Sequence, residues 1–243
     1  MIAKDKLIVA LDVDSASRAL DVFDQLREHA GMFKIGMQLF TAAGPDIVRQ
    51  IIARGSRVFL DLKYHDIPNT VAMAAIEATR LGVSIFNIHT SGGSEMMKRT
   101  VEAVAEISVR ENLTRPKVIG VTLLTSVDQE ILQRLGIDDE PKHVVGRLAL
   151  LAKESGLDGV VASAQEIETI RHTVAQRDFV IVTPGMRTNI ESSDDQRRVV
   201  TPAEAIRAGA DYLVVGRPIL DANDPVRAAR AIVEEIENSL GTS

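Results

Sequence analysis

Two lysines and two aspartates have the types and spacing of a charged functional cluster. Asp61, Lys63 and Asp66 follow an apolar run, and Lys34 lies within an earlier one. Side chains alternate in extended backbone, so Asp61 and Lys63 are predicted to project to the same side. A buried charge costs several kcal/mol unless it is paired. Two ammonium groups and two carboxylates can satisfy one another, which predicts a functional array; a structural ion network and solvated loop charges remain the alternatives.

His65 lies inside the same segment, and we interpret it as a spacer or a supporting residue rather than a catalytic one. Asp61, His65 and Asp66 together offer ligand types that a metal ion accepts. The two lysines argue against a divalent cation unless a substrate reorganises the site. The sequence therefore predicts no metal site.

A second group of residues is suited to an anion. About seventeen residues separate Thr183 from the helix cap at Thr201, whereas a βα loop usually has about 2–6. This long segment is predicted to be a binding loop or a lid, with Arg187 near its start and Gln196, Arg197 and Arg198 further on. Gly216-Arg217 follows the last apolar run; glycine permits close backbone approach and arginine supplies a planar fork for phosphate. We expect Arg217 to bind phosphate, and Arg197 and Arg198 to be solvated surface residues.

The elements that must position these groups form a repeating strand–helix pattern. Short apolar, β-branched runs, each followed by a helical pattern, are typical of parallel strands covered by helices. The predicted strands are Leu7–Leu11, Phe33–Gly36, Arg57–Leu60, Ser84–Ile88, Val118–Thr122, Gly159–Ala162, Phe179–Val182 and Tyr212–Val215. Eight such units predict an α/β fold, a (β/α)₈ TIM barrel, whose active site lies at the carboxyl ends of the strands. Asp12 stands at the end of the first of them.

Helices are predicted over Ala16–Arg27, Asp46–Arg54, Thr70–Leu81 and Glu95–Glu106. Two further helix starts carry capping boxes, Ser163–Glu166 and Thr201–Glu204. No linker or low-complexity stretch divides the chain, and neither the dinucleotide fingerprint nor the phosphate loop motif is present. The prediction is one domain over residues 1–243.

Composition excludes several classes of function. The 243 residues carry a net charge of −6 and contain no Cys, no Trp and two Tyr. Nucleic-acid binding relies on clustered Lys and Arg and on aromatic stacking, so no nucleic-acid partner is expected. The absence of Cys removes disulfides, thiolate metal sites and thiol catalysis.

No membrane or targeting segment is expected either. The first apolar run, Leu7–Leu11, is shorter than the roughly 7–15 residues of a signal peptide core. The longest uncharged span, Gly82–Ser94, is below the roughly 18 apolar residues of a membrane helix. We expect a cytoplasmic protein.

The segment Asp61–Thr70, Asp-Leu-Lys-Tyr-His-Asp-Ile-Pro-Asn-Thr, resembles the signature of the orotidine 5′-phosphate decarboxylase family. The resemblance extends over essentially the whole chain and is closest to the bacterial branch. It also includes, in chain order, Val9–Asp12, Phe33–Gly36, Val121–Ser126, Pro184–Arg187 and Val215–Ile219.

The resemblance implies a set of roles. Lys34, Asp61, Lys63 and Asp66 match the family's charged tetrad, with Lys63 as the proton donor. The implied enzyme converts orotidine 5′-monophosphate to UMP in de novo pyrimidine biosynthesis, without a cofactor, as a homodimer in which Asp66 and Thr70 reach the partner's site. The implied substrate ligands are Asp12 (ribose), Thr122 (nucleotide pocket), and Arg187, Gln196, Gly216 and Arg217 (phosphate).

This chemistry is physically consistent. Loss of CO₂ from C6 of the pyrimidine leaves a carbanion with no adjacent electron sink, so a preorganised cation must stabilise it. Carboxylates beside Lys63 favour its ammonium form. Two alternatives remain: a Mg²⁺-dependent sugar-phosphate decarboxylase or aldolase of the same barrel superfamily, which shares the Asp-x-Lys-x-x-Asp pattern, and a non-catalytic barrel that binds a phosphate ligand.

Overall fold

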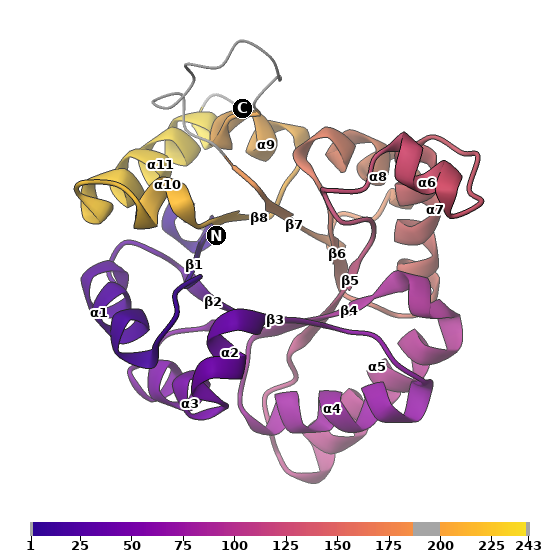
Figure 1. The fold of residues 1–243 in the computed structure, drawn as a ribbon, viewed down its shortest axis with the longest axis horizontal. Coiled ribbons are helices and arrows are strands. Elements are labelled where there is room, and N and C mark those ends of the chain that lie inside the picture. Colours follow the sequence, from indigo (N-terminus) through magenta and orange to yellow (C-terminus); the bar gives the residue numbers. More distant parts are fainter. Residues whose placement is uncertain (1, 187–199, 242–243) are drawn as a thin grey trace. The chain divides into compact units, whose positions relative to one another are not determined.

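The strands of the protein are parallel and close into a barrel in the order β1 to β8 (Figure 1). The computed structural model describes residues 2–186 and 200–241. The strands are β1 (Leu7–Ala10), β2 (Met32–Gly36), β3 (Val58–Tyr64), β4 (Ile85–His89), β5 (Lys117–Val121), β6 (Gly159–Val161), β7 (Val180–Pro184) and β8 (Tyr212–Val215). The predicted (β/α)₈ fold is confirmed.

Helices separate the strands along the chain. The α-helices are α1 (Ala16–Leu26), α2 (Met37–Ala43), α3 (Asp46–Ala53), α4 (Pro68–Arg80), α5 (Gly93–Arg110), α6 (Gln129–Arg134), α7 (Pro141–Glu154), α8 (Ile167–Val174), α9 (Pro202–Ala208), α10 (Arg217–Leu220) and α11 (Pro225–Leu240). Short 3₁₀ turns are η1 (Ala3–Lys6), η2 (Thr90–Gly92) and η3 (Ala164–Glu166). Among the described residues, no helix is both long enough and apolar enough to cross a membrane.

The third strand differs most from its prediction. The apolar run suggested Arg57–Leu60, whereas β3 continues to Tyr64. Backbone pairing accounts for the first step of the difference, because the ladder between β2 and β3 pairs Gly36 with Asp61, one residue beyond the predicted run. Asp61 and Lys63 are therefore part of the strand itself, whereas Asp66 follows it.

Both predicted capping boxes are present. The Thr201 hydroxyl accepts from the Glu204 N–H at 3.2 Å, and the Glu204 carboxylate accepts from the Thr201 N–H at 2.8 Å. The box at Ser163 and Glu166 is also complete, and it opens the short turn η3 rather than α8 directly. Local side-chain hydrogen bonds thus fix these two helix starts, as the sequence indicates.

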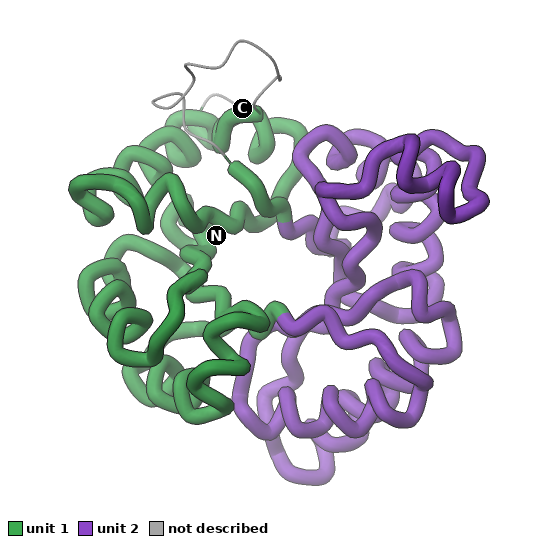
Figure 2. Tube along the Cα trace, in the orientation of Figure 1, with its two compact units in different colours: residues 1–61, 183–243 green, residues 62–182 purple. Residues whose placement is uncertain are grey.

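The chain divides into two compact units, residues 1–61 with 183–243 and residues 62–182 (Figure 2). In the first unit, β1 pairs with both β2 and β8, and β2 pairs with β3. Phe23 of α1 packs against Phe33 of β2, with ring centroids 4.9 Å apart. The interpretation of residues 1–243 as a single domain stays a prediction.

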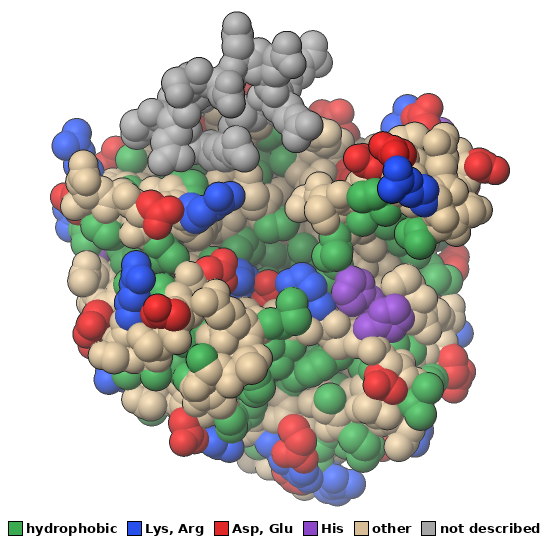
Figure 3. Space-filling view, in the orientation of Figure 1, with side chains coloured by type: hydrophobic (Ala, Val, Ile, Leu, Met, Phe, Trp, Pro, Cys, Tyr) green, Lys and Arg blue, Asp and Glu red, His purple; other side chains and the backbone are tan. Residues whose placement is uncertain are grey.

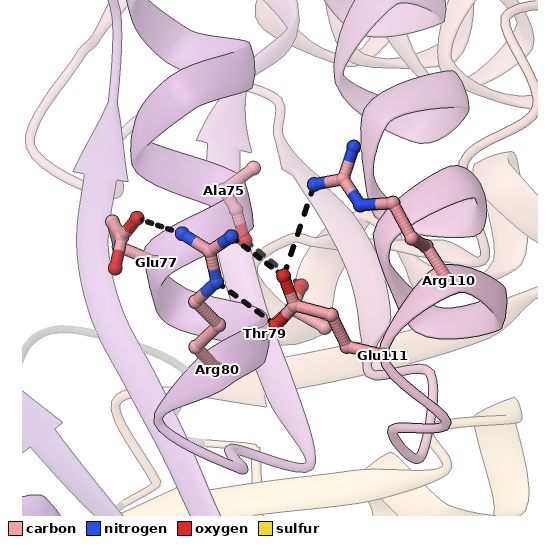
Figure 4. Close-up of polar contacts among 6 residues, drawn as sticks. All are labelled: Ala75, Glu77, Thr79, Arg80, Arg110 and Glu111. Carbon is pink, nitrogen blue, oxygen red and sulfur yellow. Dashed lines mark hydrogen bonds and ion pairs between the residues drawn. The ribbon is translucent and has the colours of Figure 1, made fainter.

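The second unit contains the ladder β4–β5–β6–β7 and the helix pair α4 and α5. Figure 4 shows Arg80 of α4 between Glu77 and Glu111. Its guanidinium donates to Glu77 at 2.6 Å and to both carboxylate oxygens of Glu111 at 2.7 and 3.0 Å. The hydrogen bond from Arg80 lowers the pKa of Glu111, and Arg110 adds to this effect from 3.8 Å. The network ties the end of α4 to the end of α5.

Candidate active site

Lys34 of β2 is held between two carboxylates. Its Nζ donates to Asp12 Oδ1 at 2.8 Å and lies 3.4 Å from Asp61 Oδ2. The Lys34 side chain is 10% exposed and that of Asp61 13%, whereas Asp12 is 54% exposed. Three predicted site residues on β2, on β3 and just after β1 therefore meet. Burial of Lys34 and Asp61 beside one another satisfies the requirement that buried charges be paired.

Gly36 leaves the space that this charge group needs. A Cβ at Gly36 would lie 3.0 Å from Lys34 Nζ and 3.3 Å from Asp12 Oδ1. Any larger residue would therefore press on the ammonium and its carboxylate partner. No role was predicted for Gly36, whose only signal in the sequence is its place in the segment Phe33–Gly36.

The predicted phosphate residues at the end of β8 lie beside the predicted ribose residue. β8 pairs with β1, with Val215 opposite Val9. A Cβ at Gly216 would be in van der Waals contact with Asp12, 3.6 Å from its Oδ2. Arg217, the first residue of α10, follows and is exposed. Along the first unit, the order across neighbouring strands is Gly216–Arg217, Asp12, Lys34, Asp61.

Lys63 has an unusual backbone conformation. Its φ is +52°, a left-handed value that costs a residue with a Cβ roughly 1–2 kcal/mol. The prediction that Lys63 projects to the same side as Asp61 assumed an extended backbone at both residues. That assumption is wrong at Lys63. Another influence must set the direction of the Lys63 side chain.

The backbone of Lys63 is anchored to β4. Its N–H donates to Oδ1 of Asn87 at 2.8 Å, and Asn87 is fully buried. The next residue, Tyr64, packs against Phe86, with ring centroids 6.1 Å apart, and burial raises the pKa of its phenol. Sequence reasoning missed Asn87; its signal was a polar residue inside the otherwise apolar run Ile85–Ile88.

Asp66 and Thr70 lie on the exposed segment that leads into α4. Asp66 accepts a hydrogen bond from the Ile67 N–H at 2.7 Å, and Thr70 is in the first turn of α4. Both side chains are exposed in the single chain. Asp66 and Thr70 do not hydrogen-bond to one another. Their predicted function stays a prediction.

His65 packs against His89, the last residue of β4. Their ring centroids are 5.3 Å apart, and Figure 3 shows histidine side chains lying next to one another on the face drawn. A Cβ at Gly92 would lie 3.3 Å from His65 Cδ2. The interpretation of His65 as a spacer or a supporting residue stays a prediction.

Thr122 follows β5 and is 3% exposed. Its hydroxyl donates to the Val161 carbonyl at 3.0 Å. This contact holds it near the end of β6, and its role at a nucleotide pocket stays a prediction. Arg187 and Gln196, predicted phosphate ligands, and Arg197 and Arg198 lie outside the described residues.

The predicted site residues are divided between the two units. The first unit brings together Asp12, Lys34 and Asp61 with Gly216 beside them, and the second unit carries Lys63 and Asp66. The complete tetrad stays a prediction. Within residues 2–186 and 200–241, no group of three or more His, Cys, Asp and Glu side chains could hold a metal ion.

A parallel barrel of eight strands with Lys34 between Asp12 and Asp61 has the architecture that many barrel enzymes share. Comparison with known sequences defines the class: residues 5–232 match the orotidine 5′-phosphate decarboxylase / HUMPS family. The chain belongs to this family.

Individual relatives cover almost the whole chain. The orotidine 5′-phosphate decarboxylase of Syntrophotalea carbinolica is 53% identical over 98% of this chain and 97% of its own. That of Geotalea uraniireducens is 55% identical over 96% of each. Among solved structures, the orotidine 5′-phosphate decarboxylase of Lactobacillus acidophilus is 35% identical, with a TM-score of 0.84 over 95% of this chain and 98% of the other.

Proposed function

We propose that the protein is a carboxy-lyase that converts orotidine 5′-monophosphate to uridine 5′-monophosphate in de novo pyrimidine biosynthesis, without a cofactor. The observation that carries this proposal is the agreement between relatives at 53–55% identity and the charge group around Lys34. Fold alone does not specify a reaction, because one barrel architecture supports many chemistries. The residues at the strand ends supply the specific argument.

The order of residues across the first unit fits a nucleotide. Gly216 and Arg217 stand after β8, Asp12 after its neighbour β1, and Lys34 and Asp61 on the next two strands. In this proposal, the phosphate binds at Arg217, a ribose hydroxyl donates to Asp12, and the pyrimidine extends toward Asp61 and Lys63. Lys34, fixed by both aspartates, keeps these carboxylates in place beside the ribose and the base.

The chemical step breaks the bond between C6 and its carboxylate carbon. CO₂ departs, and the electron pair stays on C6. The Lys63 ammonium stabilises this carbanion and transfers its proton to C6, which yields uridine 5′-monophosphate. A cation already in place needs no reorganisation as the negative charge develops, which is the main source of electrostatic catalysis. Binding energy from the distant phosphate contributes to assembly of the site.

The direct test mixes purified, metal-stripped protein with orotidine 5′-monophosphate and follows the loss of the substrate's ultraviolet absorbance. We expect turnover that EDTA does not reduce, because the proposed electron sink is an ammonium group. Mass spectrometry of the product should identify uridine 5′-monophosphate.

Two outcomes would favour the alternatives. Activity on a keto-sugar phosphate, lost with EDTA and restored by Mg²⁺, would indicate the metal-dependent branch of the superfamily. Tight binding of uridine 5′-monophosphate without any turnover of orotidine 5′-monophosphate would indicate a non-catalytic ligand-binding barrel.

We further propose a homodimer in which Asp66 and Thr70 complete the partner's site. Both side chains are exposed on the segment before and within α4. Apolar residues accompany them there: Ile67 is 67% exposed and Met73 47% exposed. Exposed apolar side chains gathered on one segment are typical of an interaction surface.

Hybrid dimers test this arrangement. Lys63→Ala and Asp66→Ala proteins are each expected to be inactive. After subunit exchange in an equal mixture, half of the dimers are hybrids, and one of the two sites in each hybrid has both residues intact. Activity should therefore recover to about a quarter of the wild-type value in a symmetric dimer. Mixtures that stay inactive while native mass spectrometry detects hybrids would show that Asp66 acts within its own chain.

We also propose that the enzyme is cytoplasmic and has no nucleic-acid partner. The net charge of −6 and the scarcity of aromatic residues support the second point.

A further inference from the structure

Lys63 is held in a conformation that its own residue type disfavours. It has a φ of +52° and is one of three residues other than glycine with a positive φ in the described part of the chain. Such conformations persist where the surrounding structure determines them, and they gather at active sites. A specific contact must therefore hold the Lys63 backbone.

Asn87 makes that contact. Its side-chain oxygen lies 2.8 Å from the Lys63 nitrogen and accepts the backbone N–H. Asn87 is fully buried on β4. A buried polar side chain in an apolar strand is costly unless its hydrogen bonds are made. The hydrogen bond thus joins Asn87, the one polar residue within the run Ile85–Ile88, to Lys63.

The adjacent contact strengthens the anchor. Tyr64 packs on Phe86, which precedes Asn87, with ring centroids 6.1 Å apart. Successive residues of β3 are thereby attached to successive residues of β4, one through a hydrogen bond and one through ring packing. All four residues belong to the second unit.

We propose that Asn87 is a positioning residue that holds Lys63 in its left-handed conformation and so directs the lysine side chain toward the reacting carbon. This inference rests on the proposed function, in which Lys63 donates the proton. Asn87 itself need not touch the substrate. Its effect is on the chemical step, because a displacement of about 1 Å in a catalytic group can reduce the rate about 100-fold.

Asn87→Leu provides the test, because leucine has a similar shape without the acceptor oxygen. We expect kcat to fall about 100-fold, whereas the Kd for uridine 5′-monophosphate should change less than about threefold, since binding depends on other residues. Asn87→Asp retains an acceptor oxygen and should recover kcat at least about tenfold relative to Asn87→Leu. Thr100→Val is the matched control: Thr100 is buried in the same unit, and its hydroxyl donates to the Met96 carbonyl at 2.7 Å.

Amide hydrogen exchange gives a readout that does not depend on turnover. The Lys63 amide should exchange at least about tenfold faster in Asn87→Leu than in the wild type and be unchanged in Thr100→Val. If the wild type does not decarboxylate the substrate, the proposed function fails. The exchange result still tests whether Asn87 holds the Lys63 backbone. A kcat within threefold of the wild type, or equal losses of kcat and nucleotide affinity, would overturn the inference. If Asn87→Leu does not fold, Asn87→Ser is measured with the same criteria.

Discussion

Lys63→Ala is expected to reduce kcat to less than about 10⁻⁴ of the wild-type value. The lysine is proposed to stabilise the C6 carbanion and to protonate it, and loss of an electrostatic donor costs about 10²–10³-fold while loss of a general acid costs about 10²–10⁴-fold. The substitution does not change the backbone strain, because alanine and lysine both carry a Cβ and a φ of +52° is equally unfavourable for either residue. Steady-state absorbance measurements at saturating substrate give the value of kcat.

Binding distinguishes this loss from a structural effect. The Kd of Lys63→Ala for uridine 5′-monophosphate should stay within about tenfold of the wild type, because phosphate and ribose contacts lie elsewhere. Lys117→Ala serves as the control, since Lys117 is an exposed lysine at the start of β5 in the same unit. If Lys63→Ala decarboxylates the substrate at a rate within tenfold of the wild type, Lys63 has no part in the mechanism.

Arg217→Ala is expected to raise KM for orotidine 5′-monophosphate by about 10–150-fold. A hydrogen bond to a charged group contributes about 1.5–3 kcal/mol, and each 1.4 kcal/mol corresponds to about a factor of ten. Arg217 is exposed, so its removal leaves no buried charge without a partner and the fold should be unaffected. Steady-state kinetics over a wide range of substrate concentration measure the change, and a smaller loss of kcat is also expected because phosphate binding contributes to assembly of the site.

A substrate without the phosphate provides the sharper comparison. On the nucleoside orotidine, Arg217→Ala and the wild type should have the same kcat/KM, because the arginine has nothing to bind. Arg230→Ala, which removes an exposed arginine from α11, should leave KM for the nucleotide unchanged. An unchanged KM in Arg217→Ala would refute the phosphate role, and equal losses on nucleotide and nucleoside would indicate a structural one.

Much of this protein follows from local sequence. Apolar β-branched runs predicted all eight strands because parallel strands are covered on both faces. The capping boxes at Ser163 and Thr201 predicted helix starts because they involve residues only three positions apart. The resemblance of Asp61–Thr70 to a family signature identified the family correctly, since such a signature is contained in one short segment.

Other features depended on pairing between distant segments. The end of β3 at Tyr64 was missed because the predicted strand ended with the apolar run at Leu60, whereas backbone pairing with β2 continues to Asp61 and the strand itself to Tyr64. The space left by Gly36 beside Lys34 and Asp12 required the register of β1 against β2. Both effects depend on strand pairing, which joins residues far apart in the sequence.

The sequence by itself determined the strand–helix order, the family and the identity of the charged residues. Only the tertiary structure decided that Lys34 sits between Asp12 and Asp61, and that Lys63 leaves the extended conformation with its N–H on Asn87. The physical reason is range: alternation and capping act over a few residues, whereas an ion pair or an anchoring hydrogen bond joins residues more than 20 positions apart. Such contacts exist only after the strands have taken their register.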